Sequence, residues 1–405
     1  MLDRRKKNLA AHLLCWLFFM LGAARAGATV MLGIDVLQQE DFAPLRGHRI
    51  GLITNQTGVN SEGEKTRLIL AHAPGVKLVA LFTPEHGLDG TEMAGRYVSS
   101  RRDPLTHLMA WSLYGPTRKP TPEMLAGIDM LVYDMQDIGC RSYTYISTLA
   151  KCMEAAGEKG IPVVVLDRPN PLGGIRVEGP GMEDRWKSFI GIFPVPYVHG
   201  MTAGELARMA NADGWVQPRC QLTVIPMRGW SRQMSWEDTG LRWVRPSPNI
   251  PYDTSPMYYV ATGMIGELAG METGVGTPQA FQIAAANHAS VERVMDEMEH
   301  LHPDGVSFSP YVEGNFQGVR LHIAPHADAN LTALGIYLLA GLDADRRPDL
   351  FQVSGGDKLE MFFKAYGSGV IRDEIERGMP PSRIVSSWSG EVGRFEEQRA
   401  RFLLY

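Results

Sequence analysis

The chain has 405 residues, of which 44% are hydrophobic and 21% are charged. These values are those of an ordinary globular protein with room for two domains, and they exclude collagen-like, low-complexity and coiled-coil chains. The formal net charge of −5 offers no excess of basic residues to bind phosphates, so we expect no nucleic-acid partner.

The first 26 residues have the pattern of a cleaved signal peptide. Basic residues at 4–7 precede an apolar run over 9–23, and Ala24-Arg25-Ala26 has the small-x-small form of a cleavage site. The run is too short to span a membrane comfortably, so we expect a secreted or periplasmic protein without stable membrane insertion. Removing residues 1–26 leaves 35 Lys and Arg against 44 Asp and Glu, a net charge of −9.

Three cysteines follow the signal peptide, at positions 140, 152 and 220. An odd number at irregular spacing is not the pattern of a disulfide framework or a zinc site. We expect three buried thiols. One disulfide with a free thiol is the alternative that an oxidising compartment allows.

Residues 30–250 are predicted to form a Rossmann-like α/β domain. Apolar runs predict strands over 48–54, 76–80, 129–133, 161–166 and 222–225. Helices are predicted over 61–73 from a capping box at Ser61, over 121–127, over 145–159, and over 202–212 from a capping box at Thr202. Nearly wholly apolar strands that alternate with helices imply a parallel sheet covered on both faces.

Residues 251–405 are predicted to form a smaller α+β domain that closes a cleft with the first. The proline-rich turn 246–251 separates the two domains, and a glycine-rich loop follows over 263–276. Ser290 caps an amphipathic helix that runs to Leu301. A strand is predicted over 318–324, and helices over 330–341, 357–367, 368–377 and 391–400.

Four of the predicted strands end in polar clusters. They are Asn55 with Gln56, Glu85 with His86, Asp134 with Gln136 and Asp137, and Asp167 with Arg168 and Asn170. In an open parallel sheet, ligands bind beyond the carboxyl ends of the strands, where such clusters meet. Short loops are polar in any protein, but that explanation fits single residues better than four clusters rich in carboxylates.

Several kinds of chemistry lack their motifs in this chain. No G-x-G-x-x-G follows the first strand, and there is no P-loop, H-E-x-x-H or G-x-S-x-G. Because the glycine motifs are missing, we expect no nucleotide cofactor. Because the histidines are scattered, we expect no metal. Carboxylates, amides, arginines and aromatic residues remain, and two carboxyl groups with separated pKa values can act as acid and base, or as acid and nucleophile.

Eight longer motifs lie at 51–59, 84–87, 133–139, 167–174, 177–180, 199–202, 246–251 and 403–405. They resemble the NamZ-type exo-β-N-acetylmuramidase family of glycoside hydrolases, over nearly all of residues 32–405. The resemblance implies a Rossmann-like domain followed by a smaller α/β domain, with the active site in the cleft between them. It also implies removal of a terminal β-linked N-acetylmuramic acid from peptidoglycan fragments.

The resemblance makes Glu85 the leading catalytic acid, with Glu178 as the candidate second carboxylate. His86 is a further candidate, which either orients Glu85 or simply bonds the backbone. Asp167 with Arg168 is explained equally well as an internal ion pair, and Asp137 as a helix cap. The candidate substrate-binding residues are Asn55, Asp134, Gln136, Asp137, Arg141, Tyr143, Tyr145, Asp167, Arg168, Asn170, His199 and Asn249.

Two segments depart from the family pattern. Leu88-Asp89-Gly90 stands where the family has an aromatic residue and then Arg-Gly, and 267–277 carries acidic residues in place of Asn and Arg. The lactyl carboxylate of N-acetylmuramic acid forms its strongest hydrogen bonds with a cationic side chain. The candidates for it are Arg141, Arg168 and Arg176.

We therefore expect a secreted glycoside hydrolase that removes terminal β-linked N-acetylmuramic acid or a related amino sugar. A non-catalytic periplasmic sugar- or muropeptide-binding protein on the same scaffold is the alternative. A metal-dependent amidase is a third possibility.

Overall fold

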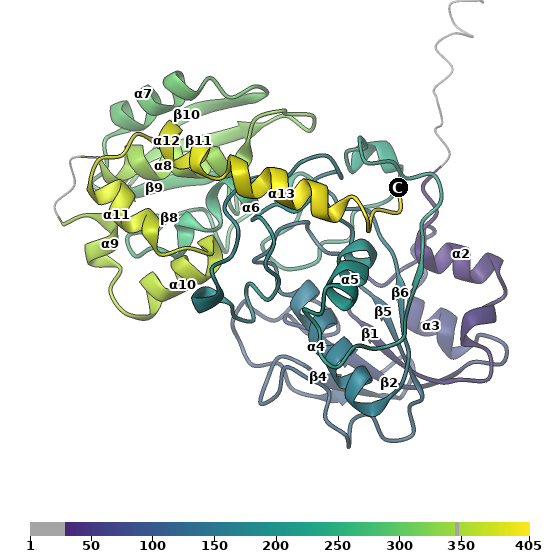
Figure 1. The fold of residues 1–405 in the computed structure, drawn as a ribbon. Helices are drawn as coiled ribbons and strands as arrows, with labels where there is room; N and C mark the ends of the chain where they lie inside the picture. Colours follow the sequence, from purple (N-terminus) through teal and green to yellow (C-terminus); the bar gives the residue numbers. More distant parts are fainter. Residues whose placement is uncertain (1–28, 345–347) are drawn as a thin grey trace, which may run out of the picture.

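The computed structural model describes residues 29–344 and 348–405, so the predicted signal peptide lies outside the described residues (Figure 1). The first part contains a seven-stranded sheet in the order β3-β4-β2-β1-β5-β6-β7. Every neighbouring pair is parallel except β3 with β4. The strands are β1 Arg49–Thr54, β2 Lys77–Thr83, β3 Arg101–Arg102, β4 Met109–Ser112, β5 Met130–Asp134, β6 Val163–Leu166 and β7 Leu222–Ile225.

Helices lie on both faces of this sheet (Figure 1). They are α2 Gly33–Gln39 and α3 Thr66–Ala71 on one face, and α4 Tyr145–Lys159 and α5 Ala203–Ala212 on the other. Successive residues of a strand point to opposite faces. In β6, Val163 and Val165 therefore pack with α4 and α5, whereas Val164 and Leu166 pack with α2. The predicted parallel sheet with two covered faces is confirmed.

The second part is smaller and contains a four-stranded antiparallel sheet in the order β10-β11-β9-β8, so the predicted α+β architecture is confirmed. The helix η4, Ile265–Glu267, belongs to it. Its other elements are α6 Ser255–Thr262, β8 Met271–Glu272, β9 Ile283–Asn287, α7 Val291–Leu301, β10 Val306–Glu313, β11 Phe316–Ile323, α8 Leu331–Asp343, α9 Leu350–Val353, α10 Asp357–Tyr366, α11 Val370–Glu376, α12 Pro381–Ser387 and α13 Ser389–Arg399.

One predicted helix in the first part begins later than expected, another is wrong, and one predicted cap is confirmed. The helix expected from Ser61 begins at Thr66, because the Ser61 hydroxyl donates to Asp35 Oδ1 (3.0 Å) instead of capping. Residues 121–127 form turns. The capping box of α5 is present: Glu205 N donates to Thr202 Oγ1 (3.2 Å), and Thr202 N donates to Glu205 Oε2 (3.0 Å).

The chain returns from the second part to the first through α13 (Figure 1). Arg399, at its end, donates hydrogen bonds to the carbonyl oxygens of His199 and Gly200. Further on, the Tyr405 ring packs edge-on against Trp230, with ring centroids 5.0 Å apart. The last residues of the chain are thus part of the packing of the first domain.

Cys140, Cys152 and Cys220 are buried free thiols, as predicted. Burial raises the pKa of the Cys140 thiol and of the Cys220 thiol to about 11. Within residues 29–344 and 348–405, no helix has the length and apolarity needed to cross a membrane.

Candidate active site

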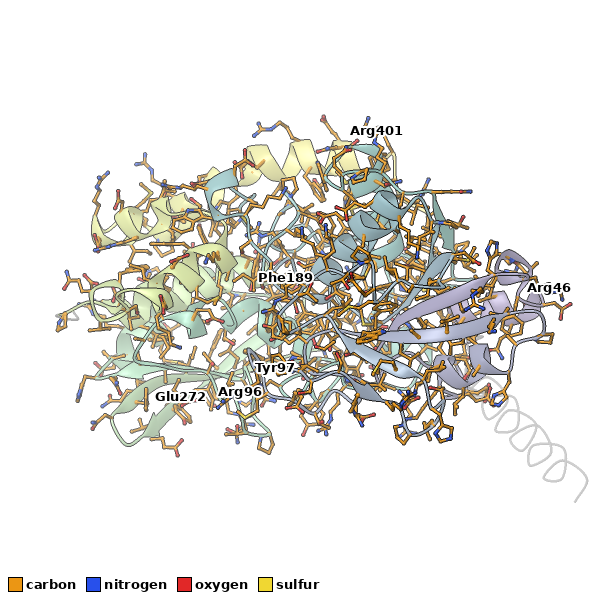
Figure 2. The ribbon with its side chains drawn as sticks, turned by 90° about the horizontal axis from the view of Figure 1, so that it is seen from below. Arg46, Arg96, Tyr97, Phe189, Glu272 and Arg401 are labelled. Carbon is orange, nitrogen blue, oxygen red and sulfur yellow. The ribbon has the colours of Figure 1, made fainter. Side chains whose placement is uncertain are left out.

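A cavity of about 500 Å³ lies beyond the end of β2, with walls from both parts of the chain. Glu85 and His86 line it from the first part, and Glu267 and Glu272 line it from the second. Figure 2 shows Glu272 beside the loop that carries Arg96 and Tyr97, where the two parts meet. The predicted position of Glu85, beyond a buried strand and facing a shared cavity, agrees with the structure.

The carboxyl group of Glu85 is held in one orientation by donors to both of its oxygens. The Thr144 hydroxyl donates to Oε2 (2.7 Å), and Gly95 N donates to Oε1 (2.8 Å). The side chain is 8% exposed. Burial raises the pKa of the neighbouring Tyr114 to about 12, and the charge of Glu85 and a hydrogen bond to it act in the same direction.

His86 fixes the turn that presents Glu85. Its Nδ1 lies 2.6 Å from the carbonyl oxygen of Glu92, and because a carbonyl oxygen can only accept, Nδ1 carries the proton in this contact. The backbone of His86 and Gly87 is left-handed, with φ of 68° and 76°. Such a conformation is uncommon for a residue with a side chain and persists only where the surrounding structure holds it, here through the bond from His86 to the Glu92 carbonyl oxygen.

Aromatic rings form one wall of the cavity. Tyr143, Tyr259 and Phe281 pack edge to face, with ring centroids 6.1 and 5.0 Å apart along the row. Such rings offer apolar faces to a sugar. Tyr145 lies behind Tyr143 and is fully buried, with its hydroxyl donated to the Pro246 carbonyl oxygen (2.5 Å). Tyr143 therefore faces the cavity as predicted, whereas Tyr145 does not.

Asn249 also lines the cavity. Its Oδ1 accepts a hydrogen bond from Gly276 N (3.0 Å), which ties the proline-rich turn to the glycine-rich loop. The Asn249 side chain therefore links two loops and also lines the cavity, where it was predicted to contact substrate.

Glu178 does not lie in this cavity, which corrects its candidacy as the second carboxylate. It pairs with Arg176, and its Oε2 accepts from Thr332 N (2.9 Å) and the Thr332 hydroxyl (3.2 Å). Thr332 is in the first turn of α8, so Glu178 satisfies a free N–H and places a negative charge at the positive end of that helix.

Arg141 does not reach the cavity either. Its side chain is fully buried and donates to the carbonyl oxygens of Pro180 (2.8 Å), Val195 (2.6 Å), Ala365 (3.1 Å) and Tyr366 (2.7 Å). Burial lowers the pKa of Arg141 to about 10. The guanidinium group joins the first part to the end of α10, and the predicted contact with substrate is replaced by a structural one.

Asp134 and Arg168 form a buried ion pair outside the cavity. Arg168 Nε lies 2.6 Å from Asp134 Oδ1, and the Thr66 hydroxyl donates to Asp134 Oδ2 (2.5 Å). Both side chains are at most 5% exposed. Their polar groups bind each other, so neither lines the wall that a substrate at Glu85 would touch.

Asp167 anchors the start of α5. Its carboxylate accepts from the Thr202 hydroxyl (2.6 Å), from Gly204 N (2.8 Å) and from the Tyr405 hydroxyl (2.8 Å). Burial raises the pKa of Asp167 to about 6. The predicted alternative, an ion pair of Asp167 with Arg168, is not what the structure shows.

Asn170 and His199 bind the backbone of the same loop region. Asn170 Oδ1 accepts from Leu172 N (2.9 Å), and its Nδ2 donates to the Met201 carbonyl oxygen (3.1 Å). His199 Nδ1 accepts from Met201 N (3.2 Å), and burial, with the charge of Arg399 next, lowers the pKa of His199 to about 3. Both predicted substrate contacts are buried structural groups.

Asn55 and Gln136 also bind neighbouring backbone and lie outside the cavity. Asn55 Oδ1 accepts from Thr57 N (2.9 Å) and from its hydroxyl (2.5 Å). Gln136 Nε2 donates to the carbonyl oxygens of Asp137 (2.8 Å) and Pro169 (2.7 Å). Gln136 thus ties the loop after β5 to the loop after β6.

Asp137 is a buried acid, and its substitution should change how stability depends on pH. Burial raises the pKa of Asp137 to about 7, while Oδ2 accepts from Gly139 N (2.7 Å). The stability that its bound proton provides is complete below the unfolded pKa near 4 and is lost as pH rises through 7. The unfolding free energy of Asp137→Asn, taken relative to that of the native protein, should therefore rise by about 4 kcal/mol between pH 4 and pH 8.

Urea unfolding of the Asp137→Asn variant and the native protein at both pH values measures this difference. Comparing the two proteins at each pH cancels the titration of every other group. A difference in unfolding free energy that stays constant from pH 4 to pH 8 would show that Asp137 is ionised in the folded state.

Several side chains that line the site were not singled out as site residues from the sequence. Thr144, Tyr114, Glu267 and Lys358 are among them. Thr144 lies between the two predicted tyrosines, and Glu267 stands in the altered second-domain loop, so both had a local signal. Burial raises the pKa of Glu267, Lys358 opposes the rise, and Glu85 adds to it. Lys358 carries no signal in the sequence beyond its place in a predicted helix.

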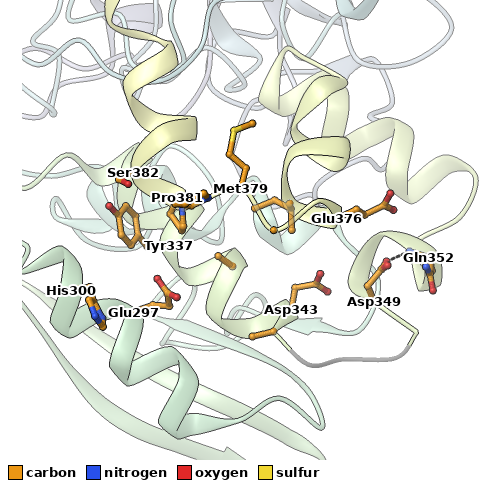
Figure 3. A pocket seen from close by; sticks show the side chains of 15 residues that line it. Glu297, His300, Tyr337, Asp343, Asp349, Gln352, Glu376, Met379, Pro381 and Ser382 are labelled. Atoms are coloured by element: carbon orange, nitrogen blue, oxygen red, sulfur yellow. Dashed lines mark hydrogen bonds between the residues drawn. The ribbon is translucent and has the colours of Figure 1, made fainter.

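A second, larger cavity of about 900 Å³ lies in the second part of the chain (Figure 3). Its wall carries Glu297, His300, Tyr337 and Asp349, and it contains none of the predicted site residues. Across residues 29–344 and 348–405, no group of three or more His, Cys, Asp and Glu side chains is arranged to hold a metal ion.

Comparison with known proteins covers both parts of the chain. Residues 50–254 match the family described as exo-β-N-acetylmuramidase NamZ, N-terminal, and residues 257–405 match its C-terminal counterpart. A curated relative is the peptidoglycan β-N-acetylmuramidase NamZ of Bacillus subtilis strain 168. It is 40% identical over 386 residues, which are 93% of this chain and 91% of the relative.

Two crystal structures of DUF1343-family proteins from Bacteroides fragilis NCTC 9343 have the same architecture. One is 40% identical with a TM-score of 0.86, and the other is 27% identical with a TM-score of 0.67. Each comparison covers 93% of this chain and 99% of the other. The chain therefore belongs to the exo-β-N-acetylmuramidase NamZ family.

Proposed function

We propose that this protein is a secreted glycoside hydrolase that removes terminal β-linked N-acetylmuramic acid from peptidoglycan fragments, with Glu85 as the general acid. Family membership supports the reaction class, because the Bacillus subtilis relative is described as a peptidoglycan β-N-acetylmuramidase. One observation carries the role of Glu85: its carboxyl group, bound by Thr144 and Gly95, faces a cavity shared by both parts of the chain. The pattern of residues 1–26 supports secretion or a periplasmic location.

The cavity has the size and lining that an exo-acting glycosidase needs. A volume of about 500 Å³ accommodates one terminal sugar, and Tyr143 and Tyr259 offer it apolar faces. Glu85 donates its proton to the glycosidic oxygen as the bond from that oxygen to the anomeric carbon breaks. The leaving glycan then departs as a neutral alcohol.

Glu267 is our proposal for the second carboxyl group, in place of Glu178. It lines the same cavity, and its pKa is raised by burial and by Glu85, so the two groups interact electrostatically. A pair of carboxyl groups in different environments is the arrangement by which glycosidases divide acid work from attack on the anomeric carbon. Such attack can also come from the acetamido group of the substrate itself.

Hydrolysis of a chromogenic β-N-acetylmuramide tests the function directly. We expect release of the chromophore from the muramide, much slower release from the matching glucosaminide, and none from the glucoside. Activity should persist in a chelator. Binding of N-acetylmuramic acid without any hydrolysis would instead identify a binding protein on this scaffold, and loss of activity in chelator would point to a metal-dependent hydrolase.

A further inference from the structure

The Glu85 cavity has an acidic wall, which is unexpected for a site that takes an anionic sugar. Three carboxyl groups line it, those of Glu85, Glu267 and Glu272. N-acetylmuramic acid carries a lactyl carboxylate, and like charges brought together in a cavity of low dielectric repel strongly. A cation that faces the same space would offset this repulsion and favour recognition of this sugar.

The arginines expected to supply that cation are engaged elsewhere. Arg141 is buried against four carbonyl oxygens, and Arg168 pairs with Asp134. Arg176 pairs with Glu178 and donates to the carbonyl oxygens of residues 327 and 329. None of the three lines the cavity.

Lys358 is the only lysine or arginine among the described residues that line the cavity. It lies in the first turn of α10, which packs against η4, the short helix that carries Glu267. Its side chain is exposed, and within the described part of the chain its ammonium group has neither a hydrogen bond nor an ion pair. Met361, one turn along α10, lines the cavity beside it.

We propose that Lys358 binds the lactyl carboxylate of the terminal N-acetylmuramic acid and thereby selects this sugar over N-acetylglucosamine. The proposal rests on the proposed function and identifies the side chain that recognises the lactyl group of its substrate. An ammonium group on a flexible four-carbon stem can approach a carboxylate from the rim of a cavity, with three donors available. The charge of Lys358 already opposes the rise in the pKa of Glu267, which places it within electrostatic reach of the acidic wall.

The proposal is tested by measuring how purified protein binds three sugars. N-acetylmuramic acid is anionic, whereas its methyl ester and N-acetylglucosamine are neutral. Titration calorimetry should show that the native protein binds N-acetylmuramic acid about tenfold more tightly than its methyl ester, because the ester removes only the charge. Lys358→Gln should bind the acid and the ester equally, and Lys358→Arg should keep most of the preference. Affinity for N-acetylglucosamine should not change in either variant.

Lys364→Gln is the matched control, because Lys364 lies on the same helix, pairs with Glu360 and does not line the cavity. It should keep the native preference for the acid. If Lys358→Gln keeps that preference too, the proposal is overturned. Thermal unfolding of the Lys358 variants should match the native protein, since the side chain is exposed.

The failure of this proposal can be told apart from the failure of the proposed function. The protein could hydrolyse the chromogenic muramide while Lys358→Gln leaves the preference for N-acetylmuramic acid over its methyl ester unchanged. That result would contradict only the role of Lys358. Conversely, the preference for N-acetylmuramic acid over its ester could depend on Lys358 in a protein that does not hydrolyse the chromogenic muramide. That result would support the role of Lys358 and contradict the proposed hydrolysis.

Discussion

Replacing Glu85 with Gln should lower the rate of N-acetylmuramic acid release from a β-linked glycan by about 10²–10⁴-fold, the usual contribution of a general acid. The amide keeps the shape of the side chain, and its oxygen can still accept the bond from Gly95 N (2.8 Å in the native protein). Sugar binding should therefore survive, measured as the affinity for N-acetylmuramic acid.

The leaving group distinguishes the acid role of Glu85 from other roles. A p-nitrophenyl leaving group needs little protonation, so Glu85→Gln should lose far less activity on the p-nitrophenyl muramide than on the glycan. An equally large loss on both substrates would assign Glu85 to attack on the anomeric carbon and leave protonation to Glu267. Glu92→Gln is the control, because Glu92 is exposed on the same loop and outside the cavity lining.

Replacing Arg141 should produce the largest loss of stability. The guanidinium group donates to four buried carbonyl oxygens, and an unpaired buried acceptor costs about 1–3 kcal/mol. Arg141→Leu should therefore lower the unfolding free energy by at least about 4 kcal/mol. Arg141→Lys keeps the charge but has three donors on one nitrogen, which cannot span the same carbonyls, so it should lose about 2 kcal/mol.

Urea unfolding followed by circular dichroism and by tryptophan fluorescence measures both losses. Arg185→Lys is the control, because Arg185 forms an exposed ion pair with Glu183, and such pairs contribute less than about 1 kcal/mol. An unfolding free energy for Arg141→Lys within 0.5 kcal/mol of native, about the size of a neutral surface substitution, would contradict the structural role given to Arg141.

The sheet was predictable because its strands are buried on both faces and are therefore apolar without interruption. The runs over 129–133 and 161–166 correspond closely to β5 and β6. The helix expected from Ser61 begins only at Thr66, because a local capping pattern cannot reveal that Asp35, 26 residues away, accepts the hydrogen bond of the Ser61 hydroxyl. The two-residue β3 and the short β4 at the edge have too few residues to show a period.

The site was predictable only in part. Four polar clusters do follow strands, but Asp134 binds Arg168, and Asp167 binds Thr202. Only the cluster after β2 remains facing the cavity. Proximity to the carboxyl edge of a sheet can be read from topology, whereas the partner that neutralises each side chain lies tens of residues away in sequence.

The carboxyl group that we propose as the second one was missed for the same reason. Glu178 lies within the motif 177–180, but its partner Thr332 lies 154 residues further on, at the start of α8. Glu267 stands in a loop that departs from the family pattern, and its place opposite Glu85 depends on how the two domains pack. That packing is set by long-range contacts such as those of Arg141, which no local pattern contains.

The return of the chain along α13 has a consequence for how substrate enters. Two lobes joined by a single crossover can swing on a hinge, but here Arg399 and Arg141 add further attachments at separate places. Opening the cleft widely would break these bonds together, so the catalytic geometry is pre-organised before the sugar arrives. Substrate capture should then proceed without a slow conformational step, and association should follow single-exponential kinetics that scale with sugar concentration.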